Sequence, residues 1–319
     1  MIRSNYGERV VVAISRVLFY VARAIAVADA GSGHGFAEGQ VRILKGFEQR
    51  MVDRIVRSAR PRWLRNRMDR AFSRYERFGP VARIELPPGR TLAVIAPHPD
   101  DESIGCGGLI ALWTAAGRRV EVVFLTGGEM GSAQVRVPGL SDADRQTVVD
   151  ALRLVRRKEA EVALGLLGAT GIWFDGTDGA LHRDEDRLTA RLCEVWSLGP
   201  PDLIAAPFPT DRHADHAVAA RIVAHAAKRV LTPDAPVLGY EVWSPAAANA
   251  VLNITQVAKI KWQAIAAHQS QTATTDYVAA TRALNSYRAI SNGQPSGFAE
   301  AYHATTCGTY AEMIDALKV

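Results

Sequence analysis

The sequence predicts an α/β protein with a Rossmann-like, doubly wound and mostly parallel sheet, helices on both of its faces, and a helical N-terminal extension. Three observations support this prediction. Short apolar runs typical of buried strands occur from residue 91 to residue 243. Helical segments alternate with them, which implies right-handed crossovers between parallel strands. A chain of 319 residues is also long enough to bury a large core.

The elements are expected in strict alternation. The expected strands are 91–97 (TLAVIAP), 119–126 (RVEVVFLT), 171–175 (GIWFD), 202–208 (DLIAAPF) and 236–243 (PVLGYEVW). The expected helices are 104–116, 145–166, 184–197 and 213–229. Such a sheet places its functional site at the carboxyl ends of its strands. The polar segments that follow Pro97 and Phe208 are therefore candidates for that site.

The first 90 residues are expected to form a separate, basic unit. Residues 1–83 contain 17 Lys and Arg against 7 Asp and Glu, a charge of about +10, whereas the whole chain carries +5. Residues 41–58 show helical spacing of apolar side chains, and prolines and a glycine at 80–89 are typical of a linker. We therefore divide the chain into a helical extension, residues 1–90, and a main domain, residues 91–319.

One stretch of this extension, residues 10–28, is apolar and long. It contains Arg16 and Arg23, which argue against a plain membrane span and against a signal peptide. Arg9 lies seven residues before Arg16, so on a helix the arginines share one face opposite the apolar side chains. This pattern fits a helix at an anionic membrane surface, and it fits equally well a helix that packs on the protein's own core. The arginines of the extension are typical of a solvated face, and we expect no nucleic-acid binding.

Composition is that of an ordinary soluble globular protein, with 48% hydrophobic and 22% charged residues. The widely spaced Cys106, Cys193 and Cys307 form neither a disulfide framework nor a thiolate metal site. Any metal must therefore take nitrogen and oxygen ligands. We expect a cytoplasmic protein, either free or associated peripherally with the inner membrane surface through residues 1–83.

One imidazole and three carboxylates lie within five positions after the first expected strand: His98, Asp100, Asp101 and Glu102. Burying so much like charge is costly without a cation. His98 and Asp101 are three residues apart and can converge on one ion, while Asp100 can face the water on that ion. Capping of the following helix would explain one carboxylate. It does not explain a histidine together with two aspartates.

A second motif lies at the start of the helix expected after Phe208. Residues three apart share a helix face, so His213 and His216 can point into one pocket. Taken alone, this spacing is more often that of surface or capping histidines. Because both motifs follow strands at the same edge of the sheet, we interpret them as one site.

Two imidazoles and one carboxylate suit zinc, and three protein ligands with an open position are typical of a hydrolytic metal site. Fe²⁺ or Co²⁺ can use the same ligands. The metal would acidify a bound water and polarise a substrate carbonyl, while a nearby carboxylate accepts the proton of the water.

The two motifs resemble the signatures of the LmbE-like, or PIG-L, family of deacetylases, A-H-P-D-D-E and, later in the chain, H-x-D-H. Residues 97–102 read PHPDDE and differ only before the histidine, and residues 213–216 read HADH. Residues 125–129, 157–159 and 261–271 also resemble family segments. The resemblance extends from about residue 91 to the C-terminus.

By this resemblance, His98, Asp101 and His216 bind the metal, and Asp100 is the general base that activates water. The resemblance also implies the roles of the remaining residues of the two motifs. His213 stabilises the oxyanion or protonates the leaving amine.

Asp215 orients His213 in this interpretation, since a carboxylate favours a protonated imidazole. Glu102 holds a ligand in place or caps the helix. Arg212 contacts a polar or phosphorylated substrate, or is simply solvated.

The family resemblance implies N-acetylated amino sugars as substrates, on small molecules, lipids or glycoconjugates. The expected enzyme is a hydrolase of linear amide C–N bonds that releases acetate from an N-acetylglucosamine-type sugar. One alternative is an amidase for a larger acyl amide or an antibiotic scaffold. Another is a non-enzymatic carbohydrate- or nucleotide-binding protein, although the acidic turn before Gly105 would repel phosphate. A serine hydrolase is disfavoured because no G-x-S-x-G turn follows a strand.

Overall fold

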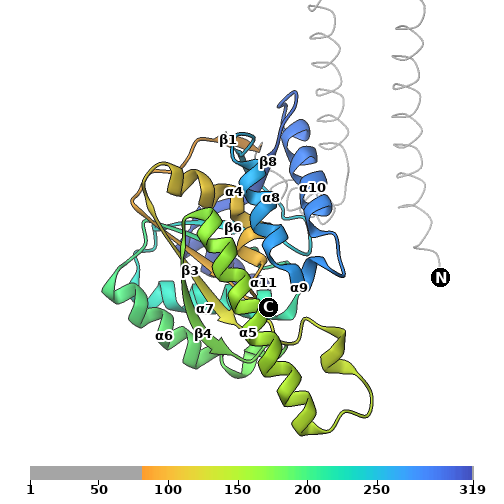
Figure 1. Cartoon of the computed structure of the whole chain (residues 1–319). Coiled ribbons are helices and arrows are strands. Elements are labelled where there is room, and N and C mark those ends of the chain that lie inside the picture. The colour runs from red at the N-terminus through yellow and green to blue at the C-terminus, as the bar shows by residue number, and fades with distance from the viewer. Residues whose placement is uncertain (1–80, 318–319) are drawn as a thin grey trace, which may run out of the picture. The chain divides into compact units, whose positions relative to one another are not determined.

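Eight strands form one sheet in the computed structural model, which describes residues 81–317 (Figure 1). The strands are β1 (Ala82–Ile84), β2 (Thr91–Ala96), β3 (Arg119–Thr126), β4 (Thr170–Gly176), β5 (Leu203–Pro207), β6 (Pro236–Tyr240), β7 (Ala250–Asn253) and β8 (Ala299–Thr306). Their order is β1-β7-β8-β6-β5-β2-β3-β4. Strand β8 is antiparallel to β6 and β7, and the other pairs are parallel. The predicted mostly parallel α/β sheet is therefore confirmed.

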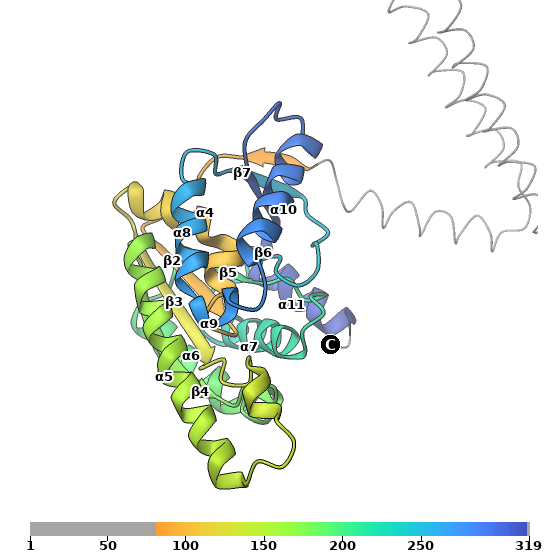
Figure 2. The ribbon, with the colours of Figure 1, turned by 45° about the vertical axis from the view of Figure 1, so that its right-hand side comes forward.

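Helices cover both faces of this sheet (Figure 2). They are α4 (Asp101–Ala115), α5 (Asp142–Leu167), α6 (Glu185–Leu198), α7 (Ala214–Val230), α8 (Ala258–Ala267), α9 (Gln269–Thr272), α10 (Tyr277–Ser291) and α11 (Cys307–Leu317), with short 3-10 turns η1 (Ala133–Arg136) and η2 (Leu181–Arg183). Every residue of β2 is buried because side chains alternate between two cores. Val94 packs with residues of α4, α5 and α8, whereas Ile95 packs with residues of α6, α7 and α11.

The elements expected between residues 91 and 243 all occur, with ends shifted by a few residues. The sequence interpretation missed β1, β7, β8 and the helices from α8 onward. Strand β1 lies in the expected linker and pairs with β7, Ala82 opposite Ala250, so the sheet begins before residue 91. The expectations for residues 1–80 fall outside the described residues, and the division into residues 1–90 and 91–319 stays a prediction. None of the helices described between residues 81 and 317 is long and apolar enough to cross a membrane.

Strand order determines where the two polar motifs meet. Strands β2 and β5 are neighbours, and the chain continues from β2 toward β3 and β4 but from β5 toward β6. The connections therefore diverge between β2 and β5, and crevices form at such points beyond the carboxyl ends of the strands. Helix α4 begins just after β2, and α7 begins just after β5. Both motifs consequently face the same crevice.

Candidate active site

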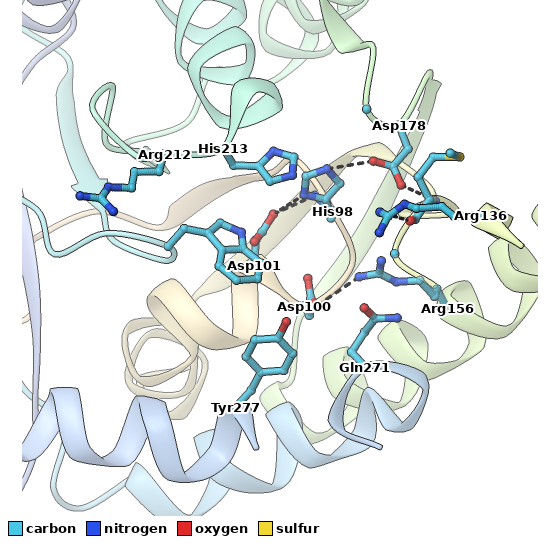
Figure 3. Close-up of a pocket in the computed structure, with 14 residues that line it drawn as sticks. His98, Asp100, Asp101, Arg136, Arg156, Asp178, Arg212, His213, Gln271 and Tyr277 are labelled. Carbon is cyan, nitrogen blue, oxygen red and sulfur yellow. Dashed lines mark hydrogen bonds and ion pairs between the residues drawn. The ribbon is translucent and has the colours of Figure 1, made fainter. Parts of the chain in front are cut away.

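A cavity of about 520 Å³ lies at the carboxyl ends of β2 and β5 (Figure 3). It is lined by His98, Asp100, Asp101, Met130, Gly131, Arg136, Arg156, Asp178, Gly179, Arg212, His213, Trp243, Gln271 and Tyr277. The loop between β2 and α4 supplies His98 and Asp100, α4 begins with Asp101, and the segment before α7 supplies Arg212 and His213. The structure thus brings the two motifs together.

The carboxylate of Asp101 lies between two histidines at the base of the cavity. Asp101 Oδ2 is 3.1 Å from His98 Nδ1 and 3.2 Å from His216 Nε2. Asp101 and His216 are almost completely buried, at 2% and 0% exposure. The rings of His98, His213 and His216 are also close, with centroids 4.7 to 5.5 Å apart. Nitrogen atoms of these three rings lie within 4.8 Å of one another.

This arrangement suits a divalent metal ion. Tetrahedral zinc ligands with bonds near 2.1 Å stand about 3.4 Å apart, close to the separations of 3.1 and 3.2 Å between Asp101 Oδ2 and the two imidazole nitrogens. His216 Nε2 is buried, and its 3.2 Å contact with Asp101 Oδ2 is an ion pair that does not meet hydrogen-bond geometry, so the nitrogen has no hydrogen bond among the described residues. A metal would satisfy that atom, since a buried polar nitrogen is otherwise costly. The side chains of the site therefore fit the divalent metal ion that the two motifs predict.

Further carboxylates contact the ring nitrogens of His216 and His98 that face away from Asp101. His216 Nδ1 lies 3.2 Å from Asp211 Oδ2, and that oxygen also accepts the backbone N–H groups of Val242 and Trp243. Such a contact fixes the ring and leaves Nε2 as the ligand atom. Asp211 was not singled out from the sequence, although it stands two residues before His213.

On its other side, His98 Nε2 lies 3.2 Å from Asp178 Oδ1 and 3.3 Å from Asp215 Oδ2. The carboxylate of Asp215 also accepts N–H groups of Gly179 and Leu181. The sequence interpretation placed the Asp215 carboxylate beside His213. In the structure it contacts His98 instead, because the first turn of α7 directs it toward the loop after β4.

The pKa values in this cluster follow from burial and charge. Burial alone lowers the pKa of His216, but Asp101 and Asp211 outweigh it and raise the value to about 9. Burial likewise opposes protonation of His98, and Asp101, Asp178 and neighbouring carboxylates raise its pKa well above the usual range. Burial raises the pKa of Asp101, but the two histidines lower it well below the usual value. Without a metal, the histidines thus hold protons where a cation would bind.

The backbone of Asp100 adopts an unusual conformation. Its φ is 136°, a region that residues with a side chain rarely occupy. Its N–H donates to Glu102 Oε2 at 2.9 Å, and its carboxylate lies 3.1 Å from Arg156 Nη2. Burial raises the pKa of Asp100 to about 6, although Arg156 opposes this shift. Strain of this kind is typical of functional residues held by their surroundings.

Glu102 is completely buried and does not line the cavity. Besides the Asp100 N–H, it accepts the Ser103 hydroxyl at 2.6 Å and lies 3.1 Å from His268 Nε2. It therefore holds the turn that presents Asp100, as a residue behind the reacting groups is expected to do. His268 belongs to the segment 261–271 that resembles the family.

His213 lies half-buried beside His98 at the cavity wall (Figure 3). Its Nδ1 accepts the backbone N–H of Asp215 at 3.2 Å. Burial, together with the nearby His98 and His216, lowers the pKa of His213. The neutral ring therefore carries its proton on Nε2. This differs from the expected protonated, carboxylate-paired imidazole.

Several cavity residues could not be identified from the sequence. Arg156 lies in an arginine-rich part of α5 that resembles a solvated helix, and Asp178 lies in a turn typical of any loop. Trp243 ends an expected strand and Tyr277 follows it in a part of the chain with no predicted element, and neither residue was expected at the site. Arg212 does line the cavity, as expected, at the side away from Arg156 (Figure 3).

Comparison with known proteins shows the family of this chain. The PIG-L model, GlcNAc-PI de-N-acetylase, matches residues 93–227. The chain is 32% identical over 198 residues to a probable N-acetyl-alpha-D-glucosaminyl L-malate deacetylase 2 of Bacillus subtilis, covering 56% of this chain and 82% of that protein. It is 31% identical over 207 residues to 1D-myo-inositol 2-acetamido-2-deoxy-alpha-D-glucopyranoside deacetylase 1 of Catenulispora acidiphila, and the match spans 59% of each protein.

Solved structures share the fold. N,N'-diacetylchitobiose deacetylase from Pyrococcus horikoshii aligns with a TM-score of 0.58 at 23% identity, covering 70% of this chain and 86% of that one. The 4-carboxy-2-hydroxymuconate hydratase from Pseudomonas putida also aligns with a TM-score of 0.58, at 25% identity, covering 68% of this chain and 96% of that one. Fold, motifs and sequence identity agree, and the chain belongs to the PIG-L family.

Proposed function

We propose that this protein is a metal-dependent N-deacetylase that hydrolyses the acetamide of an N-acetylated amino sugar and releases acetate. The observation that carries the proposal is the convergence of His98 Nδ1, Asp101 Oδ2 and His216 Nε2 beside the carboxylate of Asp100. Three ligands leave a coordination position open, and a carboxylate beside it can act as a base. The deacetylases among the relatives support the choice of substrate class.

The proposed metal is zinc, held by His98, Asp101 and His216. Nitrogen and oxygen donors with three protein ligands suit zinc, and Fe²⁺ or Co²⁺ fits the same donors. When bound, the metal polarises the amide carbonyl and acidifies the attacking water.

The proposed roles of the other residues follow from their positions. Asp100 accepts a proton from the water as its oxygen adds to the carbonyl carbon. The Nε2–H of His213 donates a hydrogen bond to the oxyanion that forms. The C–N bond then breaks, and Asp100 returns the proton to the sugar nitrogen, so that acetate and a free amine leave. Arg156 and Glu102 hold Asp100 in its strained conformation throughout.

The amino sugar is proposed to bind on the side of the cavity that carries polar side chains. Arg136, Arg156, Asp178 and Gln271 line this side and offer donors and acceptors for hydroxyl groups (Figure 3). Arg212 lies on a different side of the cavity and is proposed to contact a more distant part of the substrate.

The direct test is acetate release from a panel of N-acetylated amino sugars, free and lipid-linked, before and after chelation and zinc restoration. We expect release to need metal, and Asp100→Asn to lower kcat by about 10²- to 10⁴-fold while metal content stays unchanged. A metal-loaded protein that released no acetate but hydrated 4-carboxy-2-hydroxymuconate would contradict the proposal.

Peripheral membrane association through residues 1–83 is a separate proposal, supported by the charge of that segment and its spacing of arginines. Co-sedimentation with anionic vesicles at low salt tests it. Equal recovery with neutral and anionic vesicles would exclude it.

A further inference from the structure

A second cavity, of about 270 Å³, lies beside the first, between α10 and the segment that follows β6. Its lining is mostly apolar and includes Ile104, Val242, Leu284 and Ala301. Trp243 and Tyr277 line both cavities, and their rings meet edge to face at 6.0 Å. The two cavities therefore share an aromatic wall.

One polar atom in the second cavity has no partner. Asn285 is 3% exposed and lines the cavity, and its Oδ1 makes no hydrogen bond to the described residues. A buried acceptor without a donor is costly. A ligand that enters the cavity with a hydroxyl or N–H group would satisfy it.

The walls of this cavity are held together by a partly buried ion pair. Arg288 of α10 donates from Nε to Glu241 Oε1 at 3.0 Å, and Glu241 also accepts the N–H of Ala246 at 2.8 Å. Arg288 donates in addition to the carbonyl oxygen of Ala246. Helix α10 and the segment after β6 are thus fixed to each other, so the cavity is preformed, as ligand sites usually are.

The polar side of the first cavity and the second cavity lie toward opposite edges of the sheet, with the metal ligands between them. Arg156 and Asp178 come from α5 and the loop after β4, at the β4 edge of the sheet. The second cavity is formed by α10, which packs on β7 and β8 beyond β6. The substituents of a planar trans amide leave its C–N bond in opposite directions. A sugar bound at the polar side of the first cavity, beside Arg156 and Asp178, therefore directs the acyl group of its amide toward the second, apolar cavity.

We propose that the second cavity lets the enzyme also hydrolyse N-acyl amino sugars whose acyl chain is longer than acetyl, by binding that chain, and that a hydroxyl on the chain donates to Asn285 Oδ1. This inference rests on the proposed function, because it assumes that the amide is cleaved between the two cavities. The reaction is the same hydrolysis: water adds to the carbonyl carbon, the C–N bond breaks, the nitrogen gains a proton, and a longer carboxylate leaves.

The first experiment compares kcat/KM for N-acetyl-, N-butyryl- and N-hexanoylglucosamine with the zinc-loaded full chain. Each methylene that enters an apolar site is worth about a fourfold gain, so the four added methylenes of N-hexanoyl allow up to about 250-fold over N-acetyl, and we expect at least roughly tenfold. A fall in kcat/KM with acyl length would overturn the proposal. A second series consists of alkyl glycosides of N-acetylglucosamine. If kcat/KM rises with alkyl length in this series but not with acyl length, the cavity does not bind the acyl chain and the proposal is overturned.

A filling variant tests the location. Ala280 is exposed and lines the cavity, so Ala280→Phe should bring the ratio of the hexanoyl to the acetyl rate back toward one. Ala283→Phe is the matched control, since Ala283 is exposed on the same helix and does not line the cavity. If both variants keep the wild-type ratio, the chain binds elsewhere.

The hydroxyl is tested with hexanoyl chains that carry it at successive carbons. At least one isomer should exceed the plain chain about two- to tenfold, and Asn285→Leu should remove that advantage. No advantage for any isomer would overturn the role of Asn285. Calorimetric binding of hexanoate and acetate separates this inference from the proposed function. Tighter binding of hexanoate, lost in Ala280→Phe, supports the cavity even when no amide is cleaved, whereas equal binding contradicts it.

Discussion

Arg156 Nη2 lies 3.1 Å from Asp100 Oδ2, and the same guanidinium donates to the carbonyl oxygens of Gly128 and Pro99. Both side chains are buried. Arg156 is therefore locked by three contacts, and it presents a fixed positive charge to the carboxylate proposed as the base. That charge opposes the effect of burial on the pKa of Asp100.

Replacing Arg156 by Met should move the acidic limb of the pH–rate profile to higher pH. The base works when ionised, so kcat/KM rises with pH through the pKa of Asp100, which Arg156 lowers. If the pKa of Asp100 rises by one unit, the ionised fraction of Asp100 falls about tenfold at any pH below the pKa values of both wild type and variant. The measurement is kcat/KM of acetate release from pH 4 to 8, with exposed Arg157→Met as control. An unmoved acidic limb would show that Arg156 does not act through Asp100.

Asp211→Asn should weaken the binding of zinc. The Asp211 carboxylate orients His216 and makes the ring a better donor, and loss of such a contact typically lowers metal affinity 10- to 100-fold. Competition with a chelator measures the affinity, and kcat at saturating zinc should fall much less. Exposed Asp315→Asn, on α11, serves as control. Wild-type affinity in Asp211→Asn would mean that the His216 ring is held by packing alone.

Asp215 should act through His98 and not through His213. Its carboxylate lies 3.3 Å from His98 Nε2, and only its backbone N–H contacts His213. Asp215→Asn and His213→Ala should therefore lower kcat by factors that multiply in the double variant. A double variant no slower than His213→Ala alone would restore the role expected from the family resemblance.

Lys261→Met should destabilise the fold strongly. Lys261 is fully buried and its Nζ lies 2.5 Å from Glu300 Oε1, while Glu300 also accepts the N–H groups of Gly108 and Leu109 in α4. Removing one partner of a buried pair typically costs about 3–5 kcal/mol. Urea unfolding measures the loss, and exposed Lys228→Met should cost less than about 1 kcal/mol. Equal costs for the two variants would contradict this account of the pair.

The sequence predicted those parts of the fold and site that depend on short-range pattern. Strands β2 to β6 are apolar runs between helices, and the two motifs bring together His98, Asp101 and His216 because each motif follows a strand at the same sheet edge. Strand β8 escaped prediction because it is rich in alanine and contains the buried Glu300, whose partner Lys261 is 39 residues away. A buried charge of this kind cannot be recognised until its partner is placed.

The sequence did not predict Arg156 and Asp178 as site residues, for a related reason. Each is a common residue in an ordinary context, and its role depends on a contact with the His98–Asp101 segment across the fold. The family resemblance implied that Asp215 orients His213, whereas the first turn of α7 directs the Asp215 carboxylate to His98. Side-chain direction at a helix start depends on what packs against it.

Strand β8 is the last strand in the chain, yet it lies inside the sheet between β6 and β7. During synthesis, β1 and β7 can pair with each other but cannot join the rest of the sheet until residues 299–306 have emerged from the ribosome. Glu300, which holds α4 by its backbone, arrives with the same segment. The nascent chain therefore carries both motifs for some time before they are fixed. A chain released before β8 would carry the complete signature but lack the Glu300 carboxylate that fixes α4.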